Sequence, residues 1–380
     1  MNLDKTIHYI GFYTKEGNPN HYIEYPSCNG KMSYIISCLT RMELNVHILS
    51  LGESYNKSSK PVSERKGVLT IHYVGTIASS IWLLGKPLSR IYLLIQVLFY
   101  LLFTVKRHDT VIMYHSLATL TIAKLAKKLR PHLDIIYEIE EIYAAAYRRS
   151  QSQIDKERRA VLFTNKYIVV NDMLCNEIQK CIPNALAVVC YGTYKTYKGL
   201  NYREVTANDK INLVYAGVIG DSESDVYLAI GAMNYLPKNF CLKIVGYGSE
   251  SSLSLLQERL EGASNIIFDG LKKGPEYDQY LSACDIGMCP RKLSNELSTY
   301  TFPSKVLVYL AHGLTPVCSR IDCISKSSIA NHIVFIEELS PKGVAKAVMC
   351  AKDQLAQSNE VTVLEKLDQD FQAQLYKLLQ

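Results

Sequence analysis

The feature that most constrains this chain is an alternation of short apolar runs with segments whose apolar residues recur at helical spacing. In the first half the apolar runs fall at 7–13, 45–52, 109–116, 133–143 and 165–172. A second series of the same kind begins at residue 211. Strands joined by helices in this way pair in parallel through right-handed crossovers. The sequence therefore predicts an α/β protein with two doubly wound, Rossmann-like domains.

A polar stretch between the two series marks the expected domain boundary. Residues 195–210 lack sustained apolar periodicity, which is typical of a linker. We therefore predict an N-terminal domain over 1–198, a second domain over 199–360, and a C-terminal helix over 361–380 that could pack back on the N-terminal domain. A chain of 380 residues is long enough for two domains, each with its own core.

Charge is distributed unevenly between the two halves. Residues 1–200 hold 25 Lys and Arg against 15 Asp and Glu, whereas residues 201–380 hold 17 against 21. The net charge of +6 is too slight for a nucleic-acid-binding protein, so we expect no nucleic-acid partner. The basic first half suits an anionic membrane or a diphosphate-linked partner.

Cysteine usage and the N-terminus indicate a cytoplasmic protein. The eleven cysteines are odd in number, form no CxxC pair and lie in apolar runs, as reduced core thiols do. The first residues show no pattern of a cleaved signal peptide. We therefore expect the protein to stay in the cytoplasm.

The most apolar segment, residues 81–105, leaves three alternatives open. Lys86, Pro87, Ser89, Arg90 and Gln96 interrupt it, and the apolar run Ile91–Val105 is shorter than the roughly 20 residues that cross a bilayer. It could be a buried helix under the N-terminal sheet, or a partly exposed helix that docks on the anionic inner face of the membrane. The basic residues that flank it and favour docking are Lys86, Arg90, Lys106 and Arg107.

The strongest local pattern is TFPSKVLVYLAHGLTPV at 301–317. A proline beside a predicted helix start leaves backbone N–H groups free to bind an anion. Lys305 in the first turn opposes the helix dipole unless an anion offsets its charge. Gly313 fits the end of this helix. The segment therefore predicts a phosphate site.

Two glycine-containing segments support the same site. YAGVIG, with Gly217, and VGYGSE, with Gly246 and Gly248, each follow an apolar run and are predicted to turn at the carboxyl edge of a parallel sheet. Neither matches GxGxxG with an acidic residue about 20 positions on, so a nicotinamide cofactor is not favoured. The sequence has one Asp-x-Asp triplet, DQD at 368–370, and it falls in the predicted C-terminal helix; we expect no triplet of the kind that metal-dependent transferases use.

Taken in order, these segments resemble the donor-binding domain of GT-B glycosyltransferases. The resemblance over 211–350 rests on LVYAGVIG, LKIVGYGSE, NIIFDG, YLSACDIGMCPR and YTFPSKVLVYLAHGLTPVCS. The first half is similar to their acceptor domain through NGKMSYII, MYHS and YEIEEIY. The nearest group is the family 4-like bacterial transferases that build surface polysaccharides such as lipopolysaccharide O-antigen and capsule. The resemblance implies two Rossmann-like domains facing an interdomain cleft.

The resemblance also implies which residues bind the donor. Diphosphate contacts would come from the loop around Gly217 and Val218 and from Ser304 and Lys305. The nucleoside would lie near Gly246, Tyr247, Gly248 and Leu271, and Arg291 would approach the base or diphosphate. The sequence departs from the family where Tyr300 and Val308 replace two glutamates and where Val218 and Ile219 replace an arginine. Glu296 is a possible substitute for one of the glutamates.

Three carboxylates mark the acceptor side, because Glu138, Glu140 and Glu141 cluster at the end of one predicted strand. Like charges this close need cationic or hydroxyl partners, which favours a functional site. We expect Glu141 or Glu140 to contact the acceptor hydroxyl as a general base, and Glu138 to bind the acceptor. His115 is a second catalytic candidate, and Lys31 could meet an acceptor diphosphate.

The resulting functional hypothesis is a glycosyltransferase, peripheral on the inner face of the cell membrane. It would move a galactose-type hexose from a UDP-sugar to a lipid-linked or growing polysaccharide acceptor, by family analogy with retention. Amide dipoles and Lys305 can stabilise a leaving diphosphate, so no metal or cofactor is expected. The alternatives are a GT-B-type nucleotide-sugar epimerase and a non-catalytic, nucleotide-sugar-binding scaffold subunit. The oligomeric state is left open.

Overall fold

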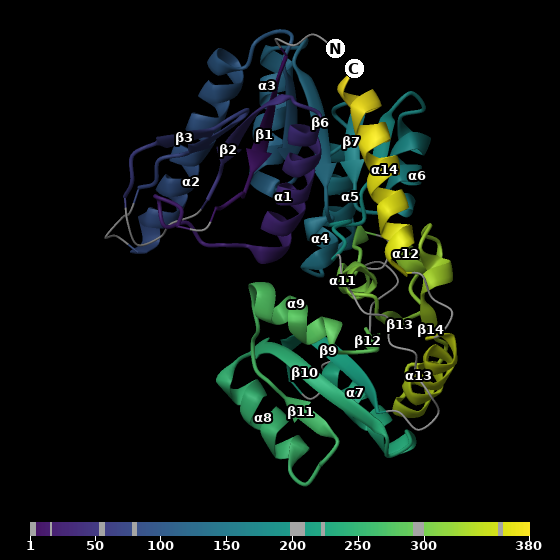
Figure 1. Ribbon diagram of the computed structural model, residues 1–380. Coiled ribbons are helices and arrows are strands. Elements are labelled where there is room, and N and C mark those ends of the chain that lie inside the picture. The colour runs from purple at the N-terminus through teal and green to yellow at the C-terminus, as the bar shows by residue number, and fades with distance from the viewer. Residues whose placement is uncertain are drawn as a thin grey trace. The chain divides into compact units, whose positions relative to one another are not determined.

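The structure is a computed structural model that describes residues 5–15, 17–52, 58–77, 82–197, 210–221, 225–291, 300–355 and 360–380. It divides into two compact units, each built around one sheet (Figure 1). Unit 1 is Met1–Thr193 with Phe371–Gln380, and unit 2 is Tyr194–Asp370. The boundary expected after residue 198 lies outside the described residues. Two α/β units agree with the predicted fold class.

Unit 1 holds an eight-stranded sheet of order β3-β4-β2-β1-β5-β6-β7-β8, parallel except where β3 meets β4. Its central strands are apolar on both faces because helices cover both sides, as β5 shows with five buried residues in succession. The strands are β1 (Thr6–Gly11), β2 (Asn45–Ser50), β3 (Val62–Lys66), β4 (Leu69–Tyr73), β5 (Thr110–Tyr114), β6 (Asp134–Ile139), β7 (Lys166–Val169) and β8 (Leu186–Val189).

The helices of unit 1 begin at local signals that the sequence carries. For α3, Ser116 and Thr119 form a reciprocal capping box directly after β5, which sets the geometry of the intervening His115. The helices are α1 (Pro26–Arg41), α2 (Trp82–Phe99), the π-helix η1 (Tyr100–Thr104), α3 (Leu117–Leu129), α4 (Tyr143–Ala146), α5 (Gln151–Ala160) and α6 (Asp172–Cys181).

Unit 2 holds a six-stranded, wholly parallel sheet of order β11-β10-β9-β12-β13-β14. Its strands are β9 (Ile211–Ile219), β10 (Phe240–Gly248), β11 (Ile266–Phe268), β12 (Ile286–Cys289), β13 (Thr315–Ser319) and β14 (Val334–Ile336). Its helices are α7 (Asp225–Ala232), η2 (Met233–Tyr235), α8 (Glu250–Leu260), α9 (Gly274–Ser282), α11 (Lys305–Ala311), α12 (Asp322–Ser325), η3 (Ala330–His332) and α13 (Pro341–Gln354).

The core of unit 2 lies between the sheet and the helices α7 and α13. Buried residues of β9 and β10, such as Leu213 and Leu242, pack there with Val226 and Val344 of the two helices. The predicted end of helix α11 is confirmed, since Gly313 has φ +74°, a conformation that glycine adopts without a steric penalty.

The C-terminal helix α14 (Glu360–Leu379) ends in unit 1 (Figure 1). Its Phe371 is buried, and the Phe371 ring lies 5.7 Å from that of Tyr34 in α1. Lys5 donates a hydrogen bond to the carbonyl of Leu379. These contacts fasten the last ten residues to unit 1.

The segment that left three alternatives open forms α2 and η1, and one apolar face of it is exposed. Leu88, Ile91, Ile95, Phe99 and Phe103 recur every three or four residues and are 48–74% exposed. The window Pro87–Thr104 is long and apolar enough to cross a membrane by length and composition, with a mean hydropathy of 1.5, and 11% of it is buried. A helix buried under the sheet is therefore not what forms.

Candidate functional site

In unit 2 three neighbouring strands carry predicted donor residues to one edge of the sheet. The register of β9 and β10 places Gly246 opposite Gly217 and Tyr247 opposite Val218. Leu271 follows β11, which pairs with β10 on its other side. The residues lie at the carboxyl ends of parallel strands, where open α/β sheets bind ligands. The structure therefore brings together residues that are up to 54 positions apart in sequence.

Three of these residues form an exposed apolar surface, which we call the apolar edge patch. The side chains of Val218, Tyr247 and Leu271 are 55%, 57% and 53% exposed. Adjacent apolar side chains that remain uncovered mark a binding surface more often than isolated ones do. An aromatic ring and two aliphatic groups suit the flat face of a nucleoside base.

Lys305, the first residue of α11, lies directly against β9. A Cβ at Gly217 would overlap the Lys305 ammonium and lie 2.6 Å from its Cε, so glycine makes room for this side chain. The ammonium also sits 4.8 Å from the centre of the Tyr215 ring. Burial lowers the pKa of Lys305, Asp225 raises it and the nearby Arg291 lowers it further. Lys305 thus lies beside Gly217 and within electrostatic reach of Arg291, and an anion would relieve the repulsion between the two cations.

The other two predicted donor glycines have a structural explanation within the sheet. A Cβ at Gly246 would overlap the Gly217 carbonyl oxygen and lie 2.9 Å from its carbon, and one at Gly248 would overlap the Ile219 oxygen. Both belong to β10, and Gly217 belongs to β9. The prediction that these glycines turn the chain after the strands is therefore wrong, because the strands continue through them.

The remaining donor candidates lie at the start of α11. Ser304 is exposed and its side chain makes no cap hydrogen bond to the helix. Tyr300 is buried, with 7% of its surface exposed, so it is less accessible to a ligand than Ser304. Glu296, the possible substitute for a family glutamate, lies outside the described residues.

In unit 1 the predicted carboxylates lie at the end of β6, and Glu138 is the most deeply buried of them. Its Oε2 accepts a 2.5 Å hydrogen bond from the Tyr9 hydroxyl. Burial and then the neighbouring Glu140 raise the pKa of Glu138 to about 8. Because its side chain has no exposed surface, the prediction that Glu138 contacts the acceptor is not supported.

Lys31 is also buried and is already neutralised. Its ammonium forms an ion pair with Glu140 and donates a 2.6 Å hydrogen bond to the Cys190 carbonyl. Burial lowers the pKa of Lys31, but Glu140, Cys190 and Glu138 together raise it by more, so the ammonium stays charged. Lys31 lies in the second turn of α1, which begins at Pro26, and its buried ammonium is out of reach of an acceptor diphosphate in this arrangement.

Glu140 and Glu141 remain as the accessible carboxylates of this edge, since both are half-buried. Glu140 forms an ion pair with Lys31. Glu141 lies close enough to Tyr143 to contribute, after burial, to raising the pKa of that hydroxyl. Both therefore stay candidates for contact with an acceptor.

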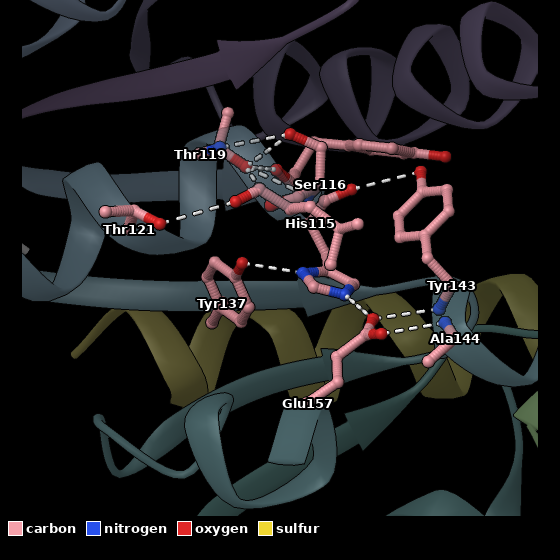
Figure 2. Close-up of polar contacts among 10 residues, drawn as sticks. His115, Ser116, Thr119, Thr121, Tyr137, Tyr143, Ala144 and Glu157 are labelled. Atoms are coloured by element: carbon pink, nitrogen blue, oxygen red, sulfur yellow. Dashed lines mark hydrogen bonds and ion pairs between the residues drawn. The ribbon is translucent and has the colours of Figure 1, made fainter. Parts of the chain in front are cut away.

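His115 is fixed on both sides, as Figure 2 shows. Its Nε2 lies 2.8 Å from Glu157 Oε1, and its Nδ1 lies 2.7 Å from the Tyr137 hydroxyl. Glu157 also accepts 2.8 Å hydrogen bonds from the backbone N–H groups of Tyr143 and Ala144. The imidazole is 1% exposed. We therefore reassign His115 from catalysis to positioning Glu157, which in turn holds the start of α4.

Sequence reasoning missed Glu157. Its signal was its position in α5, three residues after the buried Ile154 and therefore on the buried face of a polar helix. A buried carboxylate needs partners. Burial by itself raises the pKa of Glu157, but the interactions with His115 and the two backbone amides outweigh burial and lower it. The described residues contain no group of three His, Cys, Asp or Glu placed to hold a metal ion.

No protein-family model matches the chain, and no curated protein matches its sequence. Solved structures, however, resemble it over nearly its whole length. The trehalose-6-phosphate structure from E. coli bound with UDP-2-fluoro-glucose is 11% identical, with a TM-score of 0.67 and 99% of each chain covered. The Anabaena protein HepE in complex with UDP is 12% identical, with a TM-score of 0.65 and 99% of each chain covered.

A third similar structure is WaaG, a glycosyltransferase involved in lipopolysaccharide biosynthesis. It is 14% identical, with a TM-score of 0.58, and the match covers 96% of this chain and 99% of WaaG. At such low identity these similarities show the fold alone. The chain therefore has the GT-B fold, as the sequence resemblance implied.

Proposed function

We propose that this protein is a UDP-sugar-dependent glycosyltransferase, with unit 2 as its donor-binding unit. The observation that carries the proposal is the placement of Lys305 against Gly217, with Arg291 nearby and the apolar edge patch on the adjoining strands. Two cations at the carboxyl end of β9, with exposed apolar side chains at the same edge of the sheet, fit the diphosphate and the nucleoside of such a donor. Structures with the same fold bind UDP and a UDP-sugar analogue, which supports this choice of donor.

The chemistry that we propose needs no metal. The leaving group of a sugar transfer is a nucleoside diphosphate, whose developing charge Lys305 and Arg291 would stabilise. The acceptor hydroxyl would be held by Glu141 or Glu140, the accessible carboxylates of unit 1, with the carboxylate taking its proton. We further propose a galactose-type hexose, retention of configuration, and a family 4-like role in making a surface polysaccharide.

The donor assignment is tested by measuring UDP release from a panel of UDP-sugars with a lipid-linked saccharide acceptor. We expect Lys305→Ala to lower kcat/KM by about a hundredfold, the scale of losing one charged contact to a transition state. Lys342→Ala, an exposed lysine of α13, is the matched control and should leave turnover unchanged. If no donor is turned over, the transferase proposal fails. Interconversion of UDP-sugars without acceptor would instead indicate an epimerase, and binding without turnover a scaffold subunit.

We also propose that the protein is cytoplasmic and peripheral on an anionic membrane surface, through α2 and η1. The exposed stripe from Leu88 to Phe103 provides apolar contact area. Arg90 and Lys106 are exposed basic residues of the same segment, as is Arg107. A lipid-linked acceptor would be presented at such a surface.

Co-sedimentation with vesicles containing a third phosphatidylglycerol tests this membrane proposal. We expect a variant with Arg90, Lys106 and Arg107 all changed to Glu to lose binding to the vesicles. High salt should likewise abolish binding of the unaltered chain. The same reversal at Lys128, Arg159 and Lys180, which are basic residues of other helices in unit 1, is the control. Unchanged binding by the first variant would contradict the proposal. Resistance of bound protein to carbonate extraction would show that the helix spans the bilayer instead.

A further inference from the structure

A groove of about 800 Å³ lies in unit 1 between α3 and α5, and α4 contributes one wall. We call it the α3–α5 groove. It begins at the carboxyl ends of β5 and β6, because Ser116 and Tyr143 follow those strands by only a few residues. This is the edge that carries Glu140 and Glu141. Its volume suits a small ligand of one or a few sugar rings.

The groove is lined by three basic side chains, Lys124, Arg149 and Lys156. Within the part of the chain that the structure describes, none of them forms an ion pair, although the neighbouring Arg158 is paired with Glu177. Cations that remain unpaired in one concave surface attract an anion and gain from its charge.

The acidic residue of the lining cannot neutralise these cations. The two carboxylate oxygens of Glu157 already accept hydrogen bonds from His115 and from the backbone N–H groups of Tyr143 and Ala144 (Figure 2). All three contacts measure 2.8 Å, and the carboxylate is buried. The groove therefore keeps an excess of positive charge, because the one acidic side chain in its lining is already hydrogen-bonded within the protein.

One wall of the groove is aromatic. The rings of Tyr143 and Tyr147 stack with centroids 6.0 Å apart and planes 21° apart, and Tyr147 is 66% exposed. An exposed aromatic ring offers an apolar face to the C–H groups of a sugar and a hydroxyl to its edge. Cations and an exposed ring in one groove favour a ligand with both a sugar ring and a negative charge.

A turn at the end of α4 brings the exposed ring of Tyr147 and the guanidinium of Arg149 to the same groove. Arg148 has φ +51°, a left-handed conformation that costs an L-residue about 1 kcal/mol or more. The turn is closed by hydrogen bonds from the N–H of Arg148 to Ala145 and from that of Arg149 to Ala144, at 3.0 and 2.8 Å. It places Tyr147 and Arg149 on the same groove. These two hydrogen bonds form a Schellman motif, a common way for a helix such as α4 to end.

We propose that the α3–α5 groove binds an anionic saccharide, a sugar ring that carries a phosphate or carboxylate group. This inference rests on the proposed glycosyltransferase function in one respect: the saccharide is part of the acceptor, whose hydroxyl then lies toward Glu141. Lys124, Arg149 and Lys156 bind the charge, Tyr147 stacks on a ring, and His115 fixes the floor through Glu157.

Calorimetric titration of the full chain tests the proposal, with tetragalacturonate, glucose 6-phosphate, maltotetraose and inorganic phosphate as probes. We expect one of the two charged saccharides to bind at least about tenfold more tightly than neutral maltotetraose and than phosphate alone. Preference for tetragalacturonate indicates a carboxylate-bearing acceptor, and preference for glucose 6-phosphate a phosphorylated one. Equal binding of maltotetraose, or of inorganic phosphate, would overturn the proposal.

Variants locate the binding to the groove. Reversing Lys124 and Lys156 together to Glu should weaken the favoured probe by about tenfold, because two charge contacts are inverted. Reversing Lys128 and Arg159 on the same two helices, outside the lining, is the matched control and should leave affinity unchanged. Equal losses in both double variants would mean a diffuse charge effect and would contradict a site.

A second variant does not depend on charge. Tyr147→Ala should weaken saccharide binding with no change in thermal unfolding, because the side chain is largely exposed, whereas Tyr147→Phe should retain it. UDP titration of each variant separates the two proposals. Loss of saccharide binding with UDP binding intact would locate the effect in the groove. If the chain binds the saccharide but turns over no UDP-sugar, the proposal for the groove stands and the proposal of a transferase is refuted.

Discussion

Two glycines that face each other across β9 and β10 should respond to alanine in opposite ways. At Gly217 the added methyl group would overlap the end of the flexible Lys305 side chain, which can swing away. At Gly246 it would overlap the carbonyl oxygen of Gly217, which the sheet holds in place. The same chemical change thus perturbs a ligand site in one case and the backbone of a sheet in the other.

The magnitudes follow from what has to move. Gly246→Ala forces two paired strands apart, an overpacking cost of about 3 kcal/mol. For a unit of this size that corresponds to a fall in Tm of about 6–12 °C. Gly217→Ala displaces only the Lys305 ammonium and should cost less than about 1 kcal/mol in stability. It should nevertheless weaken UDP binding by about tenfold or more, because one charged contact to the diphosphate is lost.

Differential scanning calorimetry and UDP titration of both variants check this reasoning. Calorimetry is preferred because the two units can unfold in separate transitions, of which only that of unit 2 should shift. The double variant Gly217→Ala with Lys305→Ala serves as the control, since removal of the lysine removes the clash. Equal destabilisation by both single substitutions would refute the argument, as would unchanged UDP affinity in Gly217→Ala.

Three further results are expected in unit 1. The pKa of Glu138 is raised to about 8, so between pH 4.5 and 8 the folded state holds a proton that the unfolded state has released, and stability should fall as the pH rises through this interval. Urea unfolding at pH 6 and 9 should show this fall in the unaltered chain, and Glu138→Gln should remove it. Burial lowers the pKa of His8, His47 and His72, which pack in a row, so the unfolded state takes up protons first and stability should fall below about pH 6.5. Amide exchange, corrected for its intrinsic pH dependence, should show lower protection in η1, whose Tyr100 hydrogen-bonds His8. Phe103→Ser should leave the Tm unchanged but reduce vesicle binding, because this ring is 74% exposed; a large fall in Tm would mean that it is packed.

The sequence was most informative where a single local cause decides the structure. Apolar runs of strand length separated by helical patterns predicted both sheets, and Gly313 marked a helix end because only the left-handed conformation stops the chain there. The carboxyl edges of the sheets follow from the same order of elements, so Lys305 and the glutamates after β6 were found by position.

Tertiary structure decided which of those residues are accessible and how they are paired. Lys31 and Glu140 are 109 positions apart and meet only because α1 packs beside the end of β6, while Glu157 meets His115 across 42 residues. The antiparallel β3 and the exposed face of α2 likewise depend on what the rest of the unit covers. Local patterns fix backbone geometry, because dihedral preferences and capping act over a few residues. Burial and charge pairing are set by contacts between distant segments, and these contacts cannot be read from local patterns in one sequence.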